Sequence, residues 1–176
     1  MSALATPWVG TRTSRRPFAE VAEDCLDDVR RFLVFFTGDA AIADDLTAET
    51  FERGLRKWKR YDPRRGPELP WLCAIARRVA LDHFRAEARR RGREQRYAQE
   101  ELQIETLEPG GFSPELSSAL ETLSAGEREV IVLRIVLEFD ADTTARILGI
   151  GRTACSMRLS RALGKLGERM ESHAIA

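Results

Sequence analysis

The stretch DDLTAETF at residues 44–51 decides the fold, and it is followed by YDPRRG at residues 61–66. An arginine-rich segment from Trp71 to Arg91 comes next, so an acidic helix precedes a basic helix that also carries aromatic residues. Carboxylates favour contact with a basic protein surface, whereas clustered arginines favour a polyanion. This order suits a protein that holds a large partner with one face and nucleic acid with another.

Charge alternates along the chain, although the formal net charge is zero. Residues 20–50 hold 9 acidic and 2 basic side chains, and residues 52–96 hold 6 acidic and 15 basic ones. Acidic residues dominate by 8 to 1 over residues 98–129, and basic residues dominate by 6 to 1 over residues 146–169. Two basic segments separated by an acidic one predict two contacts with a polyanion.

The composition is that of a soluble globular protein with one or two domains. The chain has 176 residues, of which 32% are charged and 43% are hydrophobic. No apolar run approaches the roughly 18 residues of a membrane span. Residues 1–18 lack the apolar core of a secretion signal, so they are predicted to be a flexible extension. We therefore expect a cytoplasmic protein without membrane insertion.

The cysteines predict no disulfide framework and no zinc site. They are odd in number, far apart and not in C-x-x-C form, at Cys25, Cys73 and Cys155. Free cysteine is among the most buried residue types, so each is predicted to be a small buried hydrophobe. Redox sensing by one of them is the alternative.

Apolar residues recur at helical spacing through the first half of the chain, and strand-like alternation is absent. One helix is predicted to end at Gly38, and the next to run from Ile42 to Trp58. The two apolar stripes are Val29, Phe32, Leu33 and Phe36, and then Ile42, Leu46, Phe51, Leu55 and Trp58. A turn-rich loop at residues 61–67 leads into a helix from Pro70. That helix has a core face of Leu72, Ile75 and Val79, and a separate face with Trp71, Arg78 and Arg85.

The second half begins after a charged segment with Pro109-Gly110-Gly111, which predicts a mobile linker. Ser113-Pro114 is typical of a helix start, and Ser124 with Glu127 has the form of a capping box. Asp140 is predicted to cap a short helix that ends at Leu148, and Arg152 to begin a last helix. The residues predicted to face inward on that helix are Leu159, Ala162, Leu163 and Leu166, with Cys155 and Met157 as further core candidates. Two helices joined by a glycine-containing turn, the second one basic, are the helix-turn-helix pattern.

The fold class that follows is all-α, with two small helical domains joined by a flexible linker. The expected boundaries are an extension at residues 1–18, a first domain at 19–93, a linker at 94–113 and a second domain at 114–171.

These motifs resemble the sigma-70 family of bacterial RNA polymerase sigma factors, in its group IV or extracytoplasmic-function (ECF) type. The D-L-x-Q-E-T-F segment of region 2 corresponds to residues 45–51, with Ala48 in place of the glutamine. The Y-D-P-x-x-G loop and the W-L-x-x-I-A-R-x-x-x-L-D-x-x-R helix follow at residues 61–66 and 71–85. The L-x-x-x-x-R-E-V-x-x-L-R and A-x-x-L-G motifs of region 4 follow at residues 123–134 and 145–149, and Ser156 replaces the usual lysine of the recognition helix.

The resemblance implies three binding surfaces. The acidic helix would dock on the β′ clamp helices of core RNA polymerase through Asp44, Asp45, Leu46, Glu49 and Phe51. The −10 promoter element would be bound and melted by Tyr61, Asp62, Arg64, Arg65, Trp71, Arg77, Arg78 and Arg85. The −35 duplex would be bound by Arg152, Thr153, Ser156, Arg158, Arg161 and Lys165 in region 4, which would also contact the β flap.

Plainer interpretations remain open for these residues. The charged faces could be solvated surfaces, and Tyr61 and Trp71 could fill the core of a small helical domain. A free-standing helix-turn-helix regulator is the alternative function, and a protein-interaction module is a third. The sequence predicts no catalytic constellation, no cofactor and no metal site, so no enzyme is expected; an anti-sigma factor is a possible partner by the resemblance.

Overall fold

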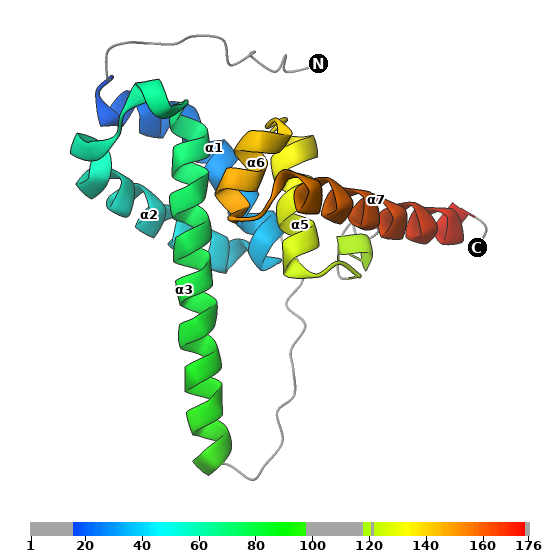
Figure 1. Ribbon diagram of the computed structural model, residues 1–176. Helices are drawn as coiled ribbons and strands as arrows, with labels where there is room; N and C mark the ends of the chain where they lie inside the picture. The colour runs from blue at the N-terminus through cyan, green and yellow to red at the C-terminus, as the bar shows by residue number, and fades with distance from the viewer. Residues whose placement is uncertain (1–15, 98–117, 121, 175–176) are drawn as a thin grey trace.

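The computed structural model describes residues 16–97, 118–120 and 122–174, and within these ranges all regular structure is helical (Figure 1). The first half consists of α1 (Phe18–Thr37), α2 (Ala40–Lys57) and α3 (Glu68–Tyr97). Two short 3-10 turns, Trp58–Arg60 and Pro63–Arg65, connect α2 to α3. The all-α prediction is confirmed.

The second half, from Ala125 onward, consists of two short helices and one long one. Helix α5 (Ala125–Ile131) continues into a π-helical turn at Val132–Val136, and α6 (Ala141–Leu148) and α7 (Arg152–Ala174) follow. The tight turn between α6 and α7 depends on Gly149, whose φ of 67° favours glycine. Helices α6 and α7 therefore form the predicted helix-turn-helix.

Three predicted helix ends are confirmed, at Gly38, Ser124 and Asp140, whereas α2 and α3 each begin two residues before the predicted Ile42 and Pro70. Gly38 ends α1 in a left-handed conformation, and its amide donates to the carbonyl of Val34. Ser124 and Glu127 form the complete capping box of α5. The Asp140 carboxylate accepts hydrogen bonds from the amides of Asp142 and Thr143 at the start of α6. The predicted helix start at Ser113-Pro114 lies outside the described residues.

The first three helices enclose a core of large apolar side chains, in which Phe32, Phe36 and Leu72 are almost fully buried. Gly54 allows α2 to approach α3 closely. A Cβ at that position would lie 3.1 Å from both Leu72 Cδ2 and Phe18 Cζ. The three cysteines are all buried, as predicted.

Some predicted core residues are at the surface. Leu55 is 57% exposed and Leu163 is 44% exposed, so the predictions that these leucines face the core are wrong. Each of these leucines lies at the edge of the apolar stripe of its helix. The spacing of apolar residues does not reveal which edge of such a stripe is covered by a neighbouring helix. On α7, Cys155 and Ala162 are buried, whereas Met157 is 54% exposed.

The two halves pack against each other. Helix α5 lies against α1, and α6 lies against α3, so that the buried apolar residues of both halves form one continuous cluster (Figure 1). Helix α3 extends to Tyr97, which is into the segment predicted as linker. The rest of that linker lies outside the described residues, as does most of the predicted N-terminal extension.

Candidate protein-binding and nucleic-acid interfaces

One side of α2 is exposed along its whole length. Asp45, Ala48, Glu52 and Leu55 are all exposed, and their spacing of three and four residues places them on one face. The face is acidic at Asp45 and Glu52 and apolar at Leu55. Ala48, which replaces the glutamine of the family motif, lies in the middle of it.

The other predicted docking residues on α2 have partners within the chain. The Nε of Arg30 donates to Asp44 Oδ1 at 2.5 Å, and Arg53 donates to Glu49 Oε1 at 2.6 Å. Leu46 is only 3% exposed, and Phe51 is half-buried with its ring edge-on to Phe18. Leu46 and Phe51 therefore hold α2 in place in this conformation.

Sequence reasoning missed Leu55 as a docking candidate because it placed this residue on the core stripe. A signal was present, since Leu55 follows Ala48 by seven residues and shares its face. Leu55 is 57% exposed and shares this face with Asp45 and Glu52, which makes it a candidate for the contact.

Arg53 joins the acidic helix to the basic helix. Its guanidinium donates to Glu49 on α2 and to Asp82 on α3, the latter at 3.1 Å. The hydrogen bond from Arg53 holds the pKa of Asp82 below its ordinary value. The orientation of α3 relative to the exposed face of α2 is thus fixed partly by one arginine.

Three aromatic rings meet between α2 and α3. Trp58 and Tyr61 stack with ring centroids 4.7 Å apart and an interplanar angle of 7°, and Trp71 lies 5.1 Å from Tyr61. Tyr61 is 7% exposed and its hydroxyl donates to the carbonyl of Gly66 at 2.8 Å. Burial raises the pKa of Tyr61 to about 12. Tyr61 thus anchors the loop, and a base could stack on it only after the ring leaves this cluster. Trp71 is half-buried, so part of this residue is already accessible.

The loop presents its charges around Asp62. The Nε of Arg64 donates to Asp62 Oδ1 at 3.0 Å, and this interaction, with the Arg64 amide, lowers the pKa of Asp62. Arg64 and Arg65 are both exposed. Two arginines at the tip of a short loop are therefore accessible to a phosphate backbone.

The three predicted arginines of α3 do not share one environment. Arg78 and Arg85 are exposed, and Arg85 also approaches Asp82 at 3.4 Å. Arg77 is half-buried and faces the second half of the chain, where its Nε donates to Glu129 Oε1 at 2.7 Å. Neither residue of the Arg77–Glu129 pair was predicted to contact the other.

At the start of α7, the side chains predicted for DNA are open to solvent. Arg152, Thr153 and Ser156 are exposed, and Arg152 lies 3.3 Å from Asp142 of α6. A recognition helix reads the major groove with its N-terminal residues, and these are the residues exposed here.

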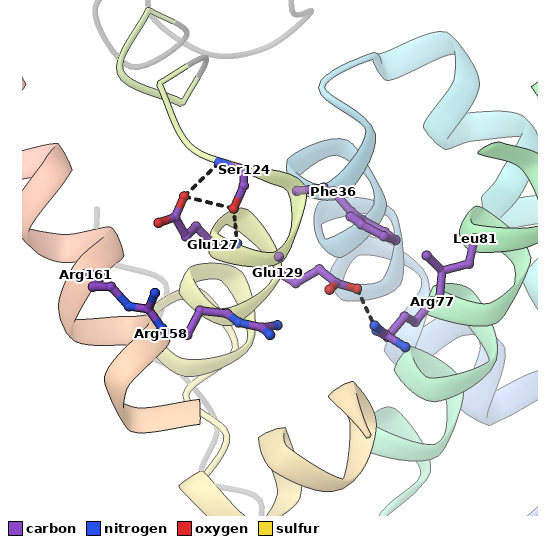
Figure 2. Close-up of a pocket in the computed structure, with 10 residues that line it drawn as sticks. Phe36, Arg77, Leu81, Ser124, Glu127, Glu129, Arg158 and Arg161 are labelled. Carbon is purple, nitrogen blue, oxygen red and sulfur yellow. Dashed lines mark hydrogen bonds and ion pairs between the residues drawn. The ribbon is translucent and has the colours of Figure 1, made fainter. Parts of the chain in front are cut away.

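Farther along α7, Arg158 and Arg161 extend toward the junction with the first half of the chain (Figure 2), whereas Lys165 pairs within the second half. Figure 2 shows Arg158 and Arg161 reaching from α7 into a cavity of about 420 Å³, opposite Arg77, with Glu129 between them. Phe36 and Leu81 line the cavity from the first half. Lys165 donates to Glu127 at 2.9 Å, and this bond, together with Ser124, lowers the pKa of Glu127 to about 2.

Residues 16–97, 118–120 and 122–174 contain neither a membrane-spanning helix nor a metal-binding cluster. No helix there is long and apolar enough to cross a membrane. No group of three or more His, Cys, Asp or Glu side chains there is arranged to hold a metal ion.

Comparison with known proteins identifies a family region in each half of the chain. Residues 21–90 match Sigma-70 region 2, and residues 114–166 match Sigma-70, region 4. The chain is 33% identical to a probable RNA polymerase sigma-C factor of Mycobacterium bovis, over 77% of this chain and 73% of that protein. It is 26% identical to the ECF RNA polymerase sigma factor BldN of Streptomyces coelicolor, over 89% of this chain and 61% of that protein, so it spans less than two thirds of that relative.

A solved structure has the same arrangement of helices. The sigma factor RpoE of Bartonella quintana, in complex with the anti-sigma factor NepR, has a TM-score of 0.69 and 26% identity, over 88% of this chain and 96% of that one. The matching regions occur in the order expected from the motifs at residues 45–51, 61–85 and 123–149. The chain therefore belongs to the sigma-70 family of RNA polymerase sigma factors, in its ECF group.

Proposed function

We propose that this chain is a promoter-specificity subunit that binds core RNA polymerase, recognises the −35 and −10 elements, and opens the −10 DNA for transcription initiation. The observation that carries the proposal is the presence of both family regions in order, with an exposed acidic face on region 2 and an exposed helix start on region 4. The factor itself is not an enzyme in this proposal, because nucleotide addition belongs to the polymerase. The site of action is the cytoplasm, where the polymerase works.

Docking on the polymerase is assigned to the exposed face of α2. Asp45 supplies charge for basic residues of the β′ clamp helices, and Leu55 supplies apolar area to bury at the C-terminal end of the face. Asp44 and Glu49 add charge at the edge, whereas Leu46 and Phe51 support the helix from behind.

Contact with the −10 element is assigned to α3 and the loop before it. Arg64, Arg65, Arg78 and Arg85 are exposed and neutralise phosphates, which gives binding that weakens as salt rises. Base capture is assigned to Tyr61 and Trp71, and it requires Tyr61 to leave its buried, stacked position; a stacked base contributes roughly 1–3 kcal/mol. Asp62 orients Arg64 for this contact.

Contact with the −35 element is assigned to the first turns of α7. Arg152 and Arg158 would reach guanine edges or phosphates, while Thr153 and Ser156 are short enough for close approach to the bases. Arg161 and Lys165 lie farther along the helix and suit the DNA backbone. Region 4 would also contact the polymerase β flap, and an anti-sigma factor is proposed as a regulatory partner because one is bound to the RpoE relative.

Reconstitution with core polymerase tests the proposal. The chain is mixed with core enzyme, and fragmented DNA of the bacterium that encodes it is transcribed and the 5′ ends are sequenced. We expect a stable complex and starts that share two spaced sequence elements. The Asp45→Lys variant should lose the complex, whereas Asp27→Lys, an equal charge change on an exposed residue of α1, should keep it.

Two results would overturn the proposal. The first is a chain that forms no complex with core enzyme. The second is a chain that binds duplex DNA by itself and starts no transcripts, because this result would favour a free-standing helix-turn-helix regulator.

A further inference from the structure

Met157 lies at the centre of the outward face of α7. Two residues along an α-helix turn the side-chain direction by about 200°, so Met157 points away from Cys155, which is 1% exposed. Met157 itself is 54% exposed. Thr153 precedes it by four residues and Ser160 follows it by three, and both are exposed on the same face. Met157 is therefore available to a partner and does not belong to the core for which the sequence made it a candidate.

The neighbouring cations lie beside this face. Arg152 Nη1 is 3.3 Å from Asp142 Oδ2 of α6, and Arg158 and Arg161 line the cavity at the junction with the first half. Arg161 also donates from its Nε to the carbonyl of Met157 at 3.3 Å. Cations at the edges of a recognition helix suit the phosphates on either side of the groove, and they position the helix without reading sequence. The bases then meet the uncharged side chains between them.

We propose that Met157 reads a thymine of the −35 element through apolar contact between its side chain and the C5-methyl group of that base. The inference rests on the function proposed above, because it takes α7 to be the helix that enters the major groove. It adds a specificity-determining residue to that function. It also predicts a thymine, on one strand or the other, at the −35 position that faces Met157.

The chemistry of the major groove favours this base. A thioether side chain has no hydrogen-bond donor and is only a weak acceptor, so it does not match the polar edges of guanine, cytosine or adenine. Thymine presents a methyl group in this groove. Methionine is unbranched and flexible, so it can adjust its side chain to that methyl group. Met157 lies in the second turn of α7, which begins at Arg152, and the N-terminal turns of a recognition helix contact base edges.

The surroundings of Met157 suit a duplex better than an apolar protein surface. Leu163 is also exposed on α7, at 44%, but six residues turn the direction by about 240°, so it points to another side of the helix. Met157 and Leu163 therefore do not form a common apolar patch of the kind that marks a protein contact. The short side chains of Thr153 and Ser160 beside Met157 leave room for a base pair to approach.

Replacing thymine with uracil tests the contact, because it removes the methyl group and keeps the base pair. The chain is assembled with core polymerase on a promoter identified by mapping its transcript starts. Each thymine of the −35 element, on either strand, is replaced singly by uracil, and the affinity of the holoenzyme for each duplex is measured. Loss of one buried methyl-sized contact corresponds to about a fourfold fall in affinity.

We expect uracil at one position to weaken binding by the unaltered holoenzyme about fourfold. Holoenzyme with Met157→Ala should bind the thymine and uracil duplexes equally well. Leu163→Ala is the matched control, since it shortens an exposed apolar side chain on another side of the same helix, and it should keep the fourfold preference. If Met157→Ala does not fold by circular dichroism, Met157→Gln takes its place, with the same expected loss of preference.

Three results overturn the inference. The first is a −35 element in which no thymine is sensitive to loss of its methyl group. The second is a preference for thymine that persists in the Met157 variants. The third is a Met157 variant that binds core polymerase less tightly and keeps the preference, because Met157 would then contact protein. A chain that forms no complex with core polymerase overturns the proposed function instead, whereas promoter binding without a methyl preference overturns only the role of Met157.

Discussion

Replacing Glu127 with glutamine removes a charge that joins the start of α5 to the middle of α7. The Glu127 carboxylate accepts hydrogen bonds from the Ser124 amide and hydroxyl and from Lys165, all within 3 Å, and its pKa is lowered from 4.5 to about 2. A shift of this size corresponds to about 3 kcal/mol between the two protonation states. Because Lys165 is 47% exposed, solvent screening reduces the expected loss to about 1–2 kcal/mol.

The same shift predicts how the loss depends on pH. The folded-state pKa of Glu127 lies below its unfolded value, so the stabilisation is complete above about pH 5 and is lost as the pH falls toward 2. Urea unfolding at pH 7 should show the Glu127→Gln variant to be less stable by about 1–2 kcal/mol, and the difference should shrink by about half at pH 3.

A surface ion pair supplies the control for this measurement. Glu52 pairs with Arg56 one turn later on α2, and both side chains are more than half exposed. Glu52→Gln should therefore cost less than about 0.5 kcal/mol at either pH. A Glu127→Gln variant as stable as Glu52→Gln at pH 7, or with an equal deficit at pH 7 and pH 3, would refute the assigned role of the carboxylate.

Three further outcomes are expected. Gly54→Ala should destabilise the chain by about 1 kcal/mol, because the added methyl group enters the α2–α3 contact. Gly164→Ala has open space around it and should stabilise α7 by about 0.5–1 kcal/mol. Thermal unfolding of both variants checks that the two effects have opposite signs. Thr144→Val should be neutral or stabilising in urea unfolding, since the buried hydroxyl has no hydrogen-bond partner among the described residues, and a loss above about 1 kcal/mol would show that a partner exists. The three cysteines should react with a thiol reagent only as fast as the chain opens, because burial raises the pKa of each thiol; fast labelling of the native protein would contradict this.

Local chemistry was readable from the sequence. The capping box at Ser124 and Glu127, the cap at Asp140 and the helix stop at Gly38 each depend on residues within a few positions of one another. Such short-range hydrogen bonds can be predicted from the residue types alone, and so could these helix ends. The order of the family motifs then placed two regions on the chain.

Long-range packing was not readable in the same way. Periodicity put Leu55 and Leu163 on apolar stripes, but it could not say that no neighbour covers them. The sequence does not distinguish Arg77 from Arg78, since both are basic neighbours on the same helix. Packing of α5 and α6 against the first half leaves Arg77 half-buried and Arg78 exposed. The Arg77–Glu129 contact has no local signature, because it depends on how two separate helical units meet.

The length of α3 has a consequence for how the chain approaches DNA. Its 30 residues form a rod about 45 Å long, and the lower part of this rod projects beyond the packed helices (Figure 1). Region 4 contacts α3 at Arg77, and farther along the same helix Arg85 and Arg89 are exposed. We therefore expect these arginines to give the chain a salt-sensitive attraction to any duplex, independent of its base sequence.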